Sequence, residues 1–244
     1  MPGSHPCAAV ERALQLKGLP YERVDLLPGL SPVIQKAMFG RRTVPGVRIG
    51  DHSRVVGSRL IMRTLESLVP EPALFPHDPE ARALVEEAEE WGDTVLQDEV
   101  RPISLAGIAA KTSAAASFLE GARIPLPASL AGPTAGPIFR AELRLLGFRP
   151  ARIRELIEAL PSRLDHVDTL IAEEVIGDPE CPNAADLQIG SSIALLSRFD
   201  DLHPLLEGRP CRTLADELFP GYPGHVPSGA LDVPARRPTQ PTPA

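Results

Sequence analysis

Three side chains at the start of the chain could support thiol chemistry. Ser4, His5 and Cys7 surround Pro6, where a helix is expected to begin. An electrophile is attacked by a thiolate rather than by a neutral thiol, so a thiol-transferring site needs a group that stabilises the anion. Ser4 or His5 could donate a hydrogen bond to it. A thiol at Cys7, in the first turn, would have its pKa lowered by the helix dipole. Ser4 ranks first.

Each of these residues also has a structural interpretation. Ser4 suits a helix N-cap, because its hydroxyl can satisfy orphan amides and Pro6 fits an early helical position. His5 could be a loop histidine without a role, and Cys7 a small buried hydrophobe. The sequence leaves open which of the three acts.

Residues 43–68 combine a Val-Pro step, a short hairpin and a helix that begins at a serine. A cis bond between Val44 and Pro45 would leave the Val44 amide and carbonyl free to pair with an extended, peptide-like ligand. The first N–H groups of the helix at Ser58 would suit a carboxylate. The alternatives are a proline that breaks a strand edge and a serine that only caps its helix.

The elements expected around these residues form a small α/β domain over residues 1–68. Apolar spacing predicts a helix over 6–17 that ends at Gly18, and alternation predicts a strand over 21–26. Strands 47–49 and 54–56 flank a turn, and a helix with Ile61 and Leu65 on one face follows. Residues 69–78 read as a linker.

From residue 79 onward the pattern is helical, and the predicted second domain spans residues 79–225. Leu84, Ala88, Trp91 and Val95 share one face of its first helix, and a periodic apolar run covers 153–171. Asn183 and Asp186 have the spacing of a capping box. The prolines and glycines of 121–137 predict an irregular insert, and the last helix is expected to end before residue 204. Residues 226–244 are predicted to be a disordered, proline-rich tail.

The composition of the chain argues against several classes of function. The net charge of −7 and 4% aromatic content argue against a nucleic-acid surface. No apolar run of membrane-spanning length and no secretory signal are apparent, which favours a cytoplasmic protein without a membrane partner. The three cysteines, Cys7, Cys181 and Cys211, are too scattered for a disulfide framework or a metal site, so we expect free thiols and no metal.

Three segments in this order resemble the glutathione S-transferase superfamily: residues 3–26 with the passage KGLPYE, the Val-Pro and serine-helix unit of 43–68, and the capping box after Pro182. The resemblance implies a thioredoxin-like N-terminal domain followed by an all-α helical-bundle domain, and a homodimer. It implies glutathione or another low-molecular-weight thiol as cosubstrate and no resident cofactor. It places the thiol-activating loop at Ser4, His5 and Cys7, with His5 at the catalytic position. The implied glutathione-binding residues are Arg42, Val44, Pro45, Gly57 and Ser58.

Two departures from the family pattern carry expectations of their own. Gly57 stands where the family has Glu or Asp, which removes a carboxylate that would meet the amino group of glutathione. Only three residues precede Ser4, so the family's first strand is expected to be missing. We therefore expect the natural start to lie upstream, and the first domain of the 244-residue chain to be unstable or inactive.

The sequence thus supports three functional hypotheses. The first is an enzyme that conjugates a low-molecular-weight thiol to a small hydrophobic electrophile. The second is a thiol-disulfide or deglutathionylating reductase in which Cys7 forms a mixed disulfide. The third is a member of the family that binds a ligand or partner without catalysis.

Overall fold

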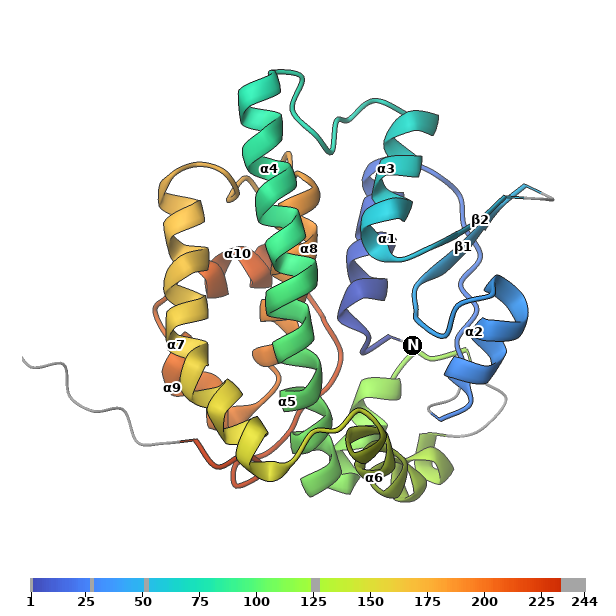
Figure 1. The fold of residues 1–244 in the computed structure, drawn as a ribbon, viewed down its shortest axis with the longest axis vertical. Helices are drawn as coiled ribbons and strands as arrows, with labels where there is room; N and C mark the ends of the chain where they lie inside the picture. The colour runs from blue at the N-terminus through green and yellow to red at the C-terminus, as the bar shows by residue number, and fades with distance from the viewer. Residues whose placement is uncertain (1, 27–28, 51–52, 124–127, 234–244) are drawn as a thin grey trace, which may run out of the picture.

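The structure, a computed structural model, describes residues 2–26, 29–50, 53–123 and 128–233, without the side chains of 128–135. It has a thioredoxin-like N-terminal domain followed by a helical domain, as predicted. Figure 1 shows the first domain, with its hairpin, on one side and the long helices of the second domain on the other. The beginning of α1 lies between them.

The first domain contains α1 (His5–Leu16), α2 (Ser31–Phe39), β1 (Gly46–Ile49), β2 (Ser53–Val56) and α3 (Ser58–Leu68). The strands pair antiparallel, with Gly46 opposite Val56. Helices α1 and α3 pack together because each presents a buried apolar face. These residues include Ala9, Val10 and Ala13 on α1, and Ile61, Met62 and Leu65 on α3. The predicted helix, hairpin and serine-started helix are confirmed.

One expectation for this domain was wrong, and one helix was not predicted. Residues 21–26 form no strand. Tyr21 is 40% exposed and Val24 is 63% exposed, and no described strand pairs with this segment. The segment is held instead by Arg23, which donates to the Gly121 carbonyl, and by Asp25, which accepts from the Arg123 N–H. Helix α2 was not predicted, because only one of its residues is fully buried and its apolar spacing is weak.

The helical domain is built around α8 (Ala184–Leu196), which is buried along its whole length. It packs against α1, α3, α4 (Pro79–Trp91), α5 (Gln97–Ala110) and α10 (Pro210–Leu218). A π-helical turn, η1 (Gly92–Leu96), joins α4 to α5. The remaining elements are η2 (Thr112–Leu119), α6 (Ala128–Leu145), α7 (Pro150–Ala172), η3 (Asp200–Leu202) and α9 (His203–Leu206).

The capping box at the start of α8 is confirmed. The Asn183 side chain accepts from the N–H groups of Ala185 and Asp186, and the Asp186 carboxylate accepts from the Asn183 N–H at 2.9 Å. The same carboxylate also accepts from the Gly177 N–H at 2.7 Å. Asp186 therefore ties the turn before α8 to the helix itself.

The predicted buried face of α4 is only partly right. Ala88 is buried as predicted, but Leu84 is 52% exposed, and Val85 and Glu89 are buried instead. Glu89 is on the inner face because it pairs with two arginines of α3: its carboxylate lies 2.6 Å from Arg63 and 3.4 Å from Arg59. An ion pair between the domains has replaced the apolar contact that the periodicity predicted.

Three further expectations for the helical domain need correction. Within residues 121–137, expected to be irregular, α6 already begins at Ala128, while residues 124–127 lie outside the described part of the chain. Helices continue past residue 204, because proline occupies the first turn of both α9 and α10 and is tolerated there. Residues 226–233 are packed rather than tail-like, since Val226 bridges to Phe199 and Leu231 is buried. Residues 234–244 are not described.

Candidate functional site

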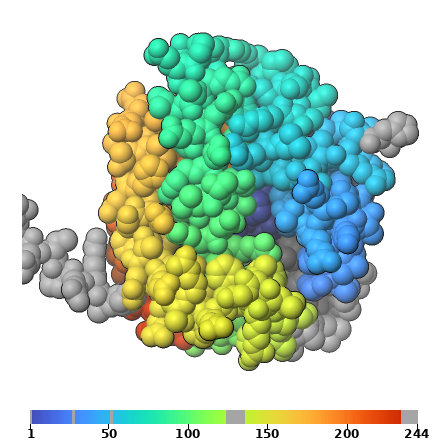
Figure 2. Space-filling model, in the orientation of Figure 1, coloured from blue at the N-terminus to red at the C-terminus, as the bar shows by residue number. Residues whose placement is uncertain are grey.

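The beginning of α1 lies at the bottom of a hollow between the two domains. Figure 2 shows the first residues of the chain, in dark blue, between the green helices of the second domain and the lighter blue of residues 29–50. Ser4 is the N-cap of α1, with an extended backbone, and Pro6 occupies the first turn. The Ser4 hydroxyl makes no capping bond to the helix and interacts instead with the side chain of Cys7.

His5 is the most buried of the predicted catalytic residues, at 5% exposed. Burial, assisted by the positive charge of Arg101, lowers the pKa of His5 to about 3. Its Nε2 atom is buried and has no hydrogen-bond partner among the described residues. The imidazole is therefore neutral at pH 7 and has one nitrogen free to face a ligand or a water molecule.

Cys7 does not have the electrostatics of an activated thiol. Burial raises the pKa of Cys7 above its ordinary value, and the interaction with the Ser4 side chain lowers it only in part. The expectation that its place in the first turn lowers this pKa was wrong, because desolvation outweighs the helix dipole. At neutral pH the side chain is a thiol rather than a thiolate.

Residues far along the chain cover this helix start, and the sequence analysis missed the main one. Tyr222 is buried and donates from its hydroxyl to the Gly3 carbonyl at 3.0 Å. Burial, and the nearby Cys7, raise the pKa of Tyr222 well above its usual value. Phe118 lies against Gly3 and accepts the Gly3 N–H through its own carbonyl at 3.2 Å. The one available signal was that Tyr222 is one of only two tyrosines.

The predicted thiol-binding residues come together at the junction of β1 and α3. The Val44–Pro45 bond is cis, as predicted, and the Gly57 N–H donates to the Pro45 carbonyl at 3.0 Å. This hydrogen bond joins the segment before β1 to the start of α3. Within the described part of the chain, neither the amide nor the carbonyl of Val44 forms a hydrogen bond, so both can pair with a ligand.

Gly57, rather than Ser58, is the N-cap of α3. Its φ of 95° lies in the region that favours glycine. Ser58 is buried in the first helical position. Gly57 has no side chain, so it provides no oxygen to cap the helix. The first N–H groups of α3 therefore lack a side-chain acceptor from the cap. Arg42 lies on the exposed stretch before Val44 and forms no ion pair with a described carboxylate.

A second residue that the sequence analysis missed is Gln35 on α2. It is buried, and its Oε1 atom has no hydrogen-bond partner among the described residues. This oxygen lies close to Gly46, because a Cβ added to that glycine would be 3.0 Å away. Gln35 thus places a free acceptor next to the Val44–Pro45 segment. Gln35 is the one buried residue of α2, so the apolar spacing of the sequence did not predict that it faces inward.

Arg101 and Phe118 of the helical domain lie near the start of α1, whereas Trp91 does not. Arg101 influences His5 and is held by Glu142 at 2.6 Å, and Phe118 contacts Gly3. Trp91 instead packs edge-on against His166 of α7, with ring centroids 4.4 Å apart. It is partly buried and packs against the hydrophobic core.

Neither a membrane-spanning helix nor a metal-binding cluster occurs in the part of the chain that the structure describes. None of the described helices combines the length and apolarity needed to cross a bilayer. No group of three or more His, Cys, Asp or Glu side chains that could hold a metal ion occurs in the described ranges.

Comparison with known proteins identifies the first domain most directly. Residues 1–73 match the family model of the glutathione S-transferase N-terminal domain. No curated protein sequence matches the chain.

Solved structures resemble the chain over most of its length. A glutathione S-transferase from Rhodospirillum rubrum F11 is 21% identical, covering 88% of this chain and 83% of its own, with a TM-score of 0.58. The β-etherase LigF from Sphingobium sp. strain SYK-6 is 21% identical, covering 88% and 96%, with a TM-score of 0.57. FzlA from C. crescentus is 19% identical, covering 91% and 92%, also at 0.57. Identities at this level show a shared fold and leave the reaction open.

Proposed function

We propose, because residues 1–73 match the glutathione S-transferase N-terminal domain and the whole chain has the fold of that superfamily, that this protein binds a low-molecular-weight thiol such as glutathione. It would conjugate the thiol to a small hydrophobic electrophile. The observation that carries the proposal is the hydrogen bond from Gly57 to the Pro45 carbonyl. This hydrogen bond places the unpaired backbone groups of Val44 next to the N-terminus of α3.

The chemistry of this junction suits a peptide-like thiol. The free amide and carbonyl of Val44 can pair with the backbone of an extended ligand. The N-terminus of α3, with Ser58 in its first turn, can accept a carboxylate. The Gln35 Oε1 atom can accept a ligand N–H. Gly57 offers no carboxylate to an ammonium group, so the affinity for glutathione itself should be modest.

The start of α1 supplies the other half of the proposed reaction. Ser4, whose hydroxyl makes no capping bond, would donate a hydrogen bond to the ligand sulfur and favour its thiolate. The thiol proton leaves to solvent, the sulfur bonds to the electrophilic carbon, and the leaving group departs with the electrons of its own bond. His5 stays neutral and positions groups around the sulfur without acting as a cation.

A reductase that works through Cys7 is less well supported. Mixed-disulfide formation begins with a thiolate, and burial raises the pKa of Cys7. One observation favours a non-catalytic member of the family. Tyr222 and Phe118 both form hydrogen bonds with Gly3 and so cover the start of α1, where the ligand sulfur would bind. A cytoplasmic location, favoured by the sequence, and assembly into a homodimer, implied by the family resemblance, remain part of the proposal.

Calorimetric titration with glutathione tests the thiol-binding assignment. Ser58→Ala should weaken binding by roughly fivefold to tenfold, because about 1 kcal/mol is typical of one net hydrogen bond. Ser67→Ala is the matched control: the same substitution on the same helix, removing a hydroxyl that bonds to the Arg63 carbonyl. If the folded Ser58→Ala protein binds glutathione as tightly as the control, the assignment of this junction is wrong.

A conjugation assay then separates the reactions. With 1-chloro-2,4-dinitrobenzene as electrophile, Ser4→Ala should lower kcat, whereas Cys7→Ser should leave it unchanged. Glutathione binding without turnover in the unsubstituted protein would support the non-catalytic alternative.

A further inference from the structure

The helical domain contains a second candidate site, a groove between α5, α6, α7 and residues 230–232. Its volume is about 710 Å³, within the roughly 300–1,000 Å³ typical of small-molecule sites. None of its lining residues belongs to the first domain, so it is separate from the thiol-binding junction. We call it the arginine groove, for the residues at its rim.

The floor of the arginine groove is apolar. Ala106 and Ala109 of α5, Ile153 and Ile157 of α7, and Leu231 line it. Short alanine side chains on α5 leave room that larger residues would fill, and the surrounding aliphatic groups hold no water strongly. Such a floor favours an alkyl chain or a flat ring over a polar ligand.

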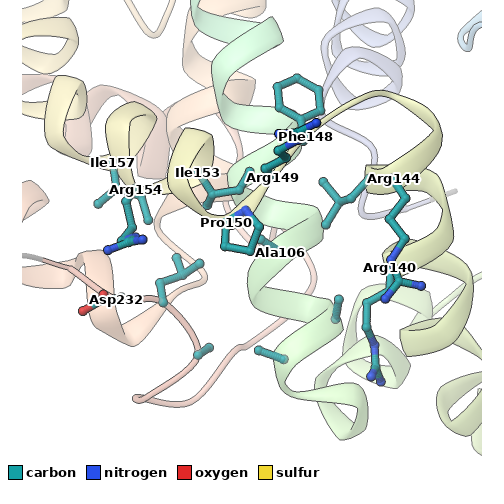
Figure 3. Close-up of a pocket in the computed structure, with 15 residues that line it drawn as sticks. Ala106, Arg140, Arg144, Phe148, Arg149, Pro150, Ile153, Arg154, Ile157 and Asp232 are labelled. Atoms are coloured by element: carbon teal, nitrogen blue, oxygen red, sulfur yellow. The ribbon is translucent and has the colours of Figure 1, made fainter.

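The rim carries positive charge. Arg140 and Arg144 of α6, Arg149 at the start of α7, and Arg154 on α7 all line the groove and are exposed. Figure 3 shows Arg140 and Arg144 on one side of the groove and Arg154 on the other, with Asp232, the single carboxylate among the lining residues. This cluster contrasts with the chain as a whole, whose net charge is −7.

These arginines differ from their neighbours in having no anionic partner. Arg101 pairs with Glu142, Arg152 with Glu155 and Arg163 with Glu99. Within the described ranges, no carboxylate forms an ion pair with a rim arginine, and Arg140 bonds only to the Gly136 carbonyl. The N-terminus of α7, at Arg149 and Pro150, adds the positive end of a 23-residue helix without a side-chain cap.

We infer that the arginine groove binds a monomeric amphiphilic anion, with a carboxylate on a hydrocarbon body of fatty-acid type. The hydrocarbon lies along the floor formed by α5 and α7, and the carboxylate meets the guanidinium groups at the rim. The guanidinium fork matches a carboxylate in shape and charge, which a neutral or cationic amphiphile cannot reproduce. The charge of the rim and the apolarity of the floor together select this class.

Calorimetric titration of the full chain with decanoate, below its micellar concentration, tests the inference. Decanoate should bind with one-to-one stoichiometry and at least tenfold more tightly than 1-decanol or decyltrimethylammonium. The double variant R144Q/R154Q should weaken decanoate at least tenfold. R152Q is the matched control, because Arg152 lies on the same turn of α7, pairs with Glu155 and does not line the groove; it should bind like the unsubstituted protein.

Two further measurements distinguish binding in the arginine groove from binding at the thiol junction or at a membrane surface. Ala106→Leu should fill the floor and reduce decanoate binding while the melting temperature and glutathione affinity stay unchanged. Saturating glutathione should leave decanoate affinity unchanged, so that failure of the thiol assignment and failure of the arginine groove are distinguishable. The inference is overturned if decanoate fails to bind, if R144Q/R154Q and R152Q behave alike, or if decanol binds equally well. It is also overturned if the protein binds phosphatidylglycerol vesicles but not free decanoate, which would make the rim a membrane-docking surface.

Discussion

Helices α1 and α8 both begin inside the protein with a nearly fully buried polar side chain in the first turn, yet their hydrogen bonding differs. At α8, Asn183 and Asp186 satisfy each other's backbone groups, and Asp186 also binds the Gly177 N–H. At α1, Ser4 makes no capping bond and the His5 Nε2 atom has no partner among the described residues. One helix start is complete, and the other has hydrogen-bonding capacity left over.

This difference separates a structural helix start from a candidate binding site. Buried polar groups are nearly always hydrogen-bonded, because an unpaired one costs about 1–3 kcal/mol. A protein tolerates that cost where a ligand or an ordered water supplies the missing partner. His5 is the first residue of α1, which begins between the two domains, and its buried Nε2 atom has no partner among the described residues.

Removal of the Asp186 carboxylate should have the largest effect. Asp186→Ala leaves the partly buried N–H groups of Asn183 and Gly177 without an acceptor, so the free energy of unfolding should fall by about 2–6 kcal/mol. Urea denaturation measures it. Asp216→Ala is the control, because Asp216 pairs with arginines at the surface and should cost under about 1 kcal/mol. Equal effects of the two substitutions would remove the structural role given to the α8 start.

The pH dependence of the free energy of unfolding should show that His5 is buried as a neutral ring. Its pKa is about 3 in the folded protein, against an ordinary value of 6.5, so folding requires the neutral ring. The stability that depends on this ring is complete above pH 6.5 and is lost as the pH falls. At pH 4.5 the loss should reach about 2–3 kcal/mol, and His5→Gln should abolish this part of the acid sensitivity. Urea denaturation of both proteins at pH 7 and 4.5 gives the comparison, and parallel losses would contradict it.

Asp186 acts in the opposite direction over the same range. Burial raises the pKa of Asp186 to about 6 from 3.8, despite the two N–H groups that it accepts. A carboxyl with a raised pKa contributes most below pH 3.8, and that contribution is lost as the pH rises through 6. The His5 measurement is therefore sharpest as a difference between two proteins that both retain Asp186.

The contrast also explains which parts of the molecule could be predicted from sequence. The capping box and the amphipathic face of α3 depend on residues three or four apart, so local spacing reveals them. The contacts over the start of α1 depend on the opposite end of the chain: Tyr222 reaches Gly3 across 219 positions. Cys7 shows the same limit. Its place in the first turn is a local signal, but its pKa is governed by burial that only the folded chain creates.

A smaller effect is expected at Gly57, where the start of α3 lacks a carboxylate. Gly57→Glu should tighten glutathione binding about tenfold to a hundredfold relative to Gly57→Ala, because a charge-assisted hydrogen bond contributes about 1.5–3 kcal/mol. Alanine is the proper reference, since both substitutions place a side chain at a φ of 95° with no atom within 4 Å of the added Cβ. Calorimetry measures the affinities. Equal affinity of the two variants would indicate a thiol without an ammonium group at this position.

The smallest effect on stability and glutathione binding is expected for substitution of Cys7, and a lack of effect is itself informative. Because burial raises the pKa of Cys7, iodoacetamide at pH 7.5 should alkylate Cys7 at least tenfold more slowly than the exposed Cys181, as followed by peptide mass spectrometry. Cys7→Ser should leave both the melting temperature and glutathione affinity nearly unchanged. Alkylation of Cys7 as fast as Cys181 would mean that the α1 start stabilises an anion of its own. The unsatisfied groups there would then serve the protein's thiolate rather than the ligand's, and mixed-disulfide chemistry at Cys7 would replace conjugation as the better account of this site.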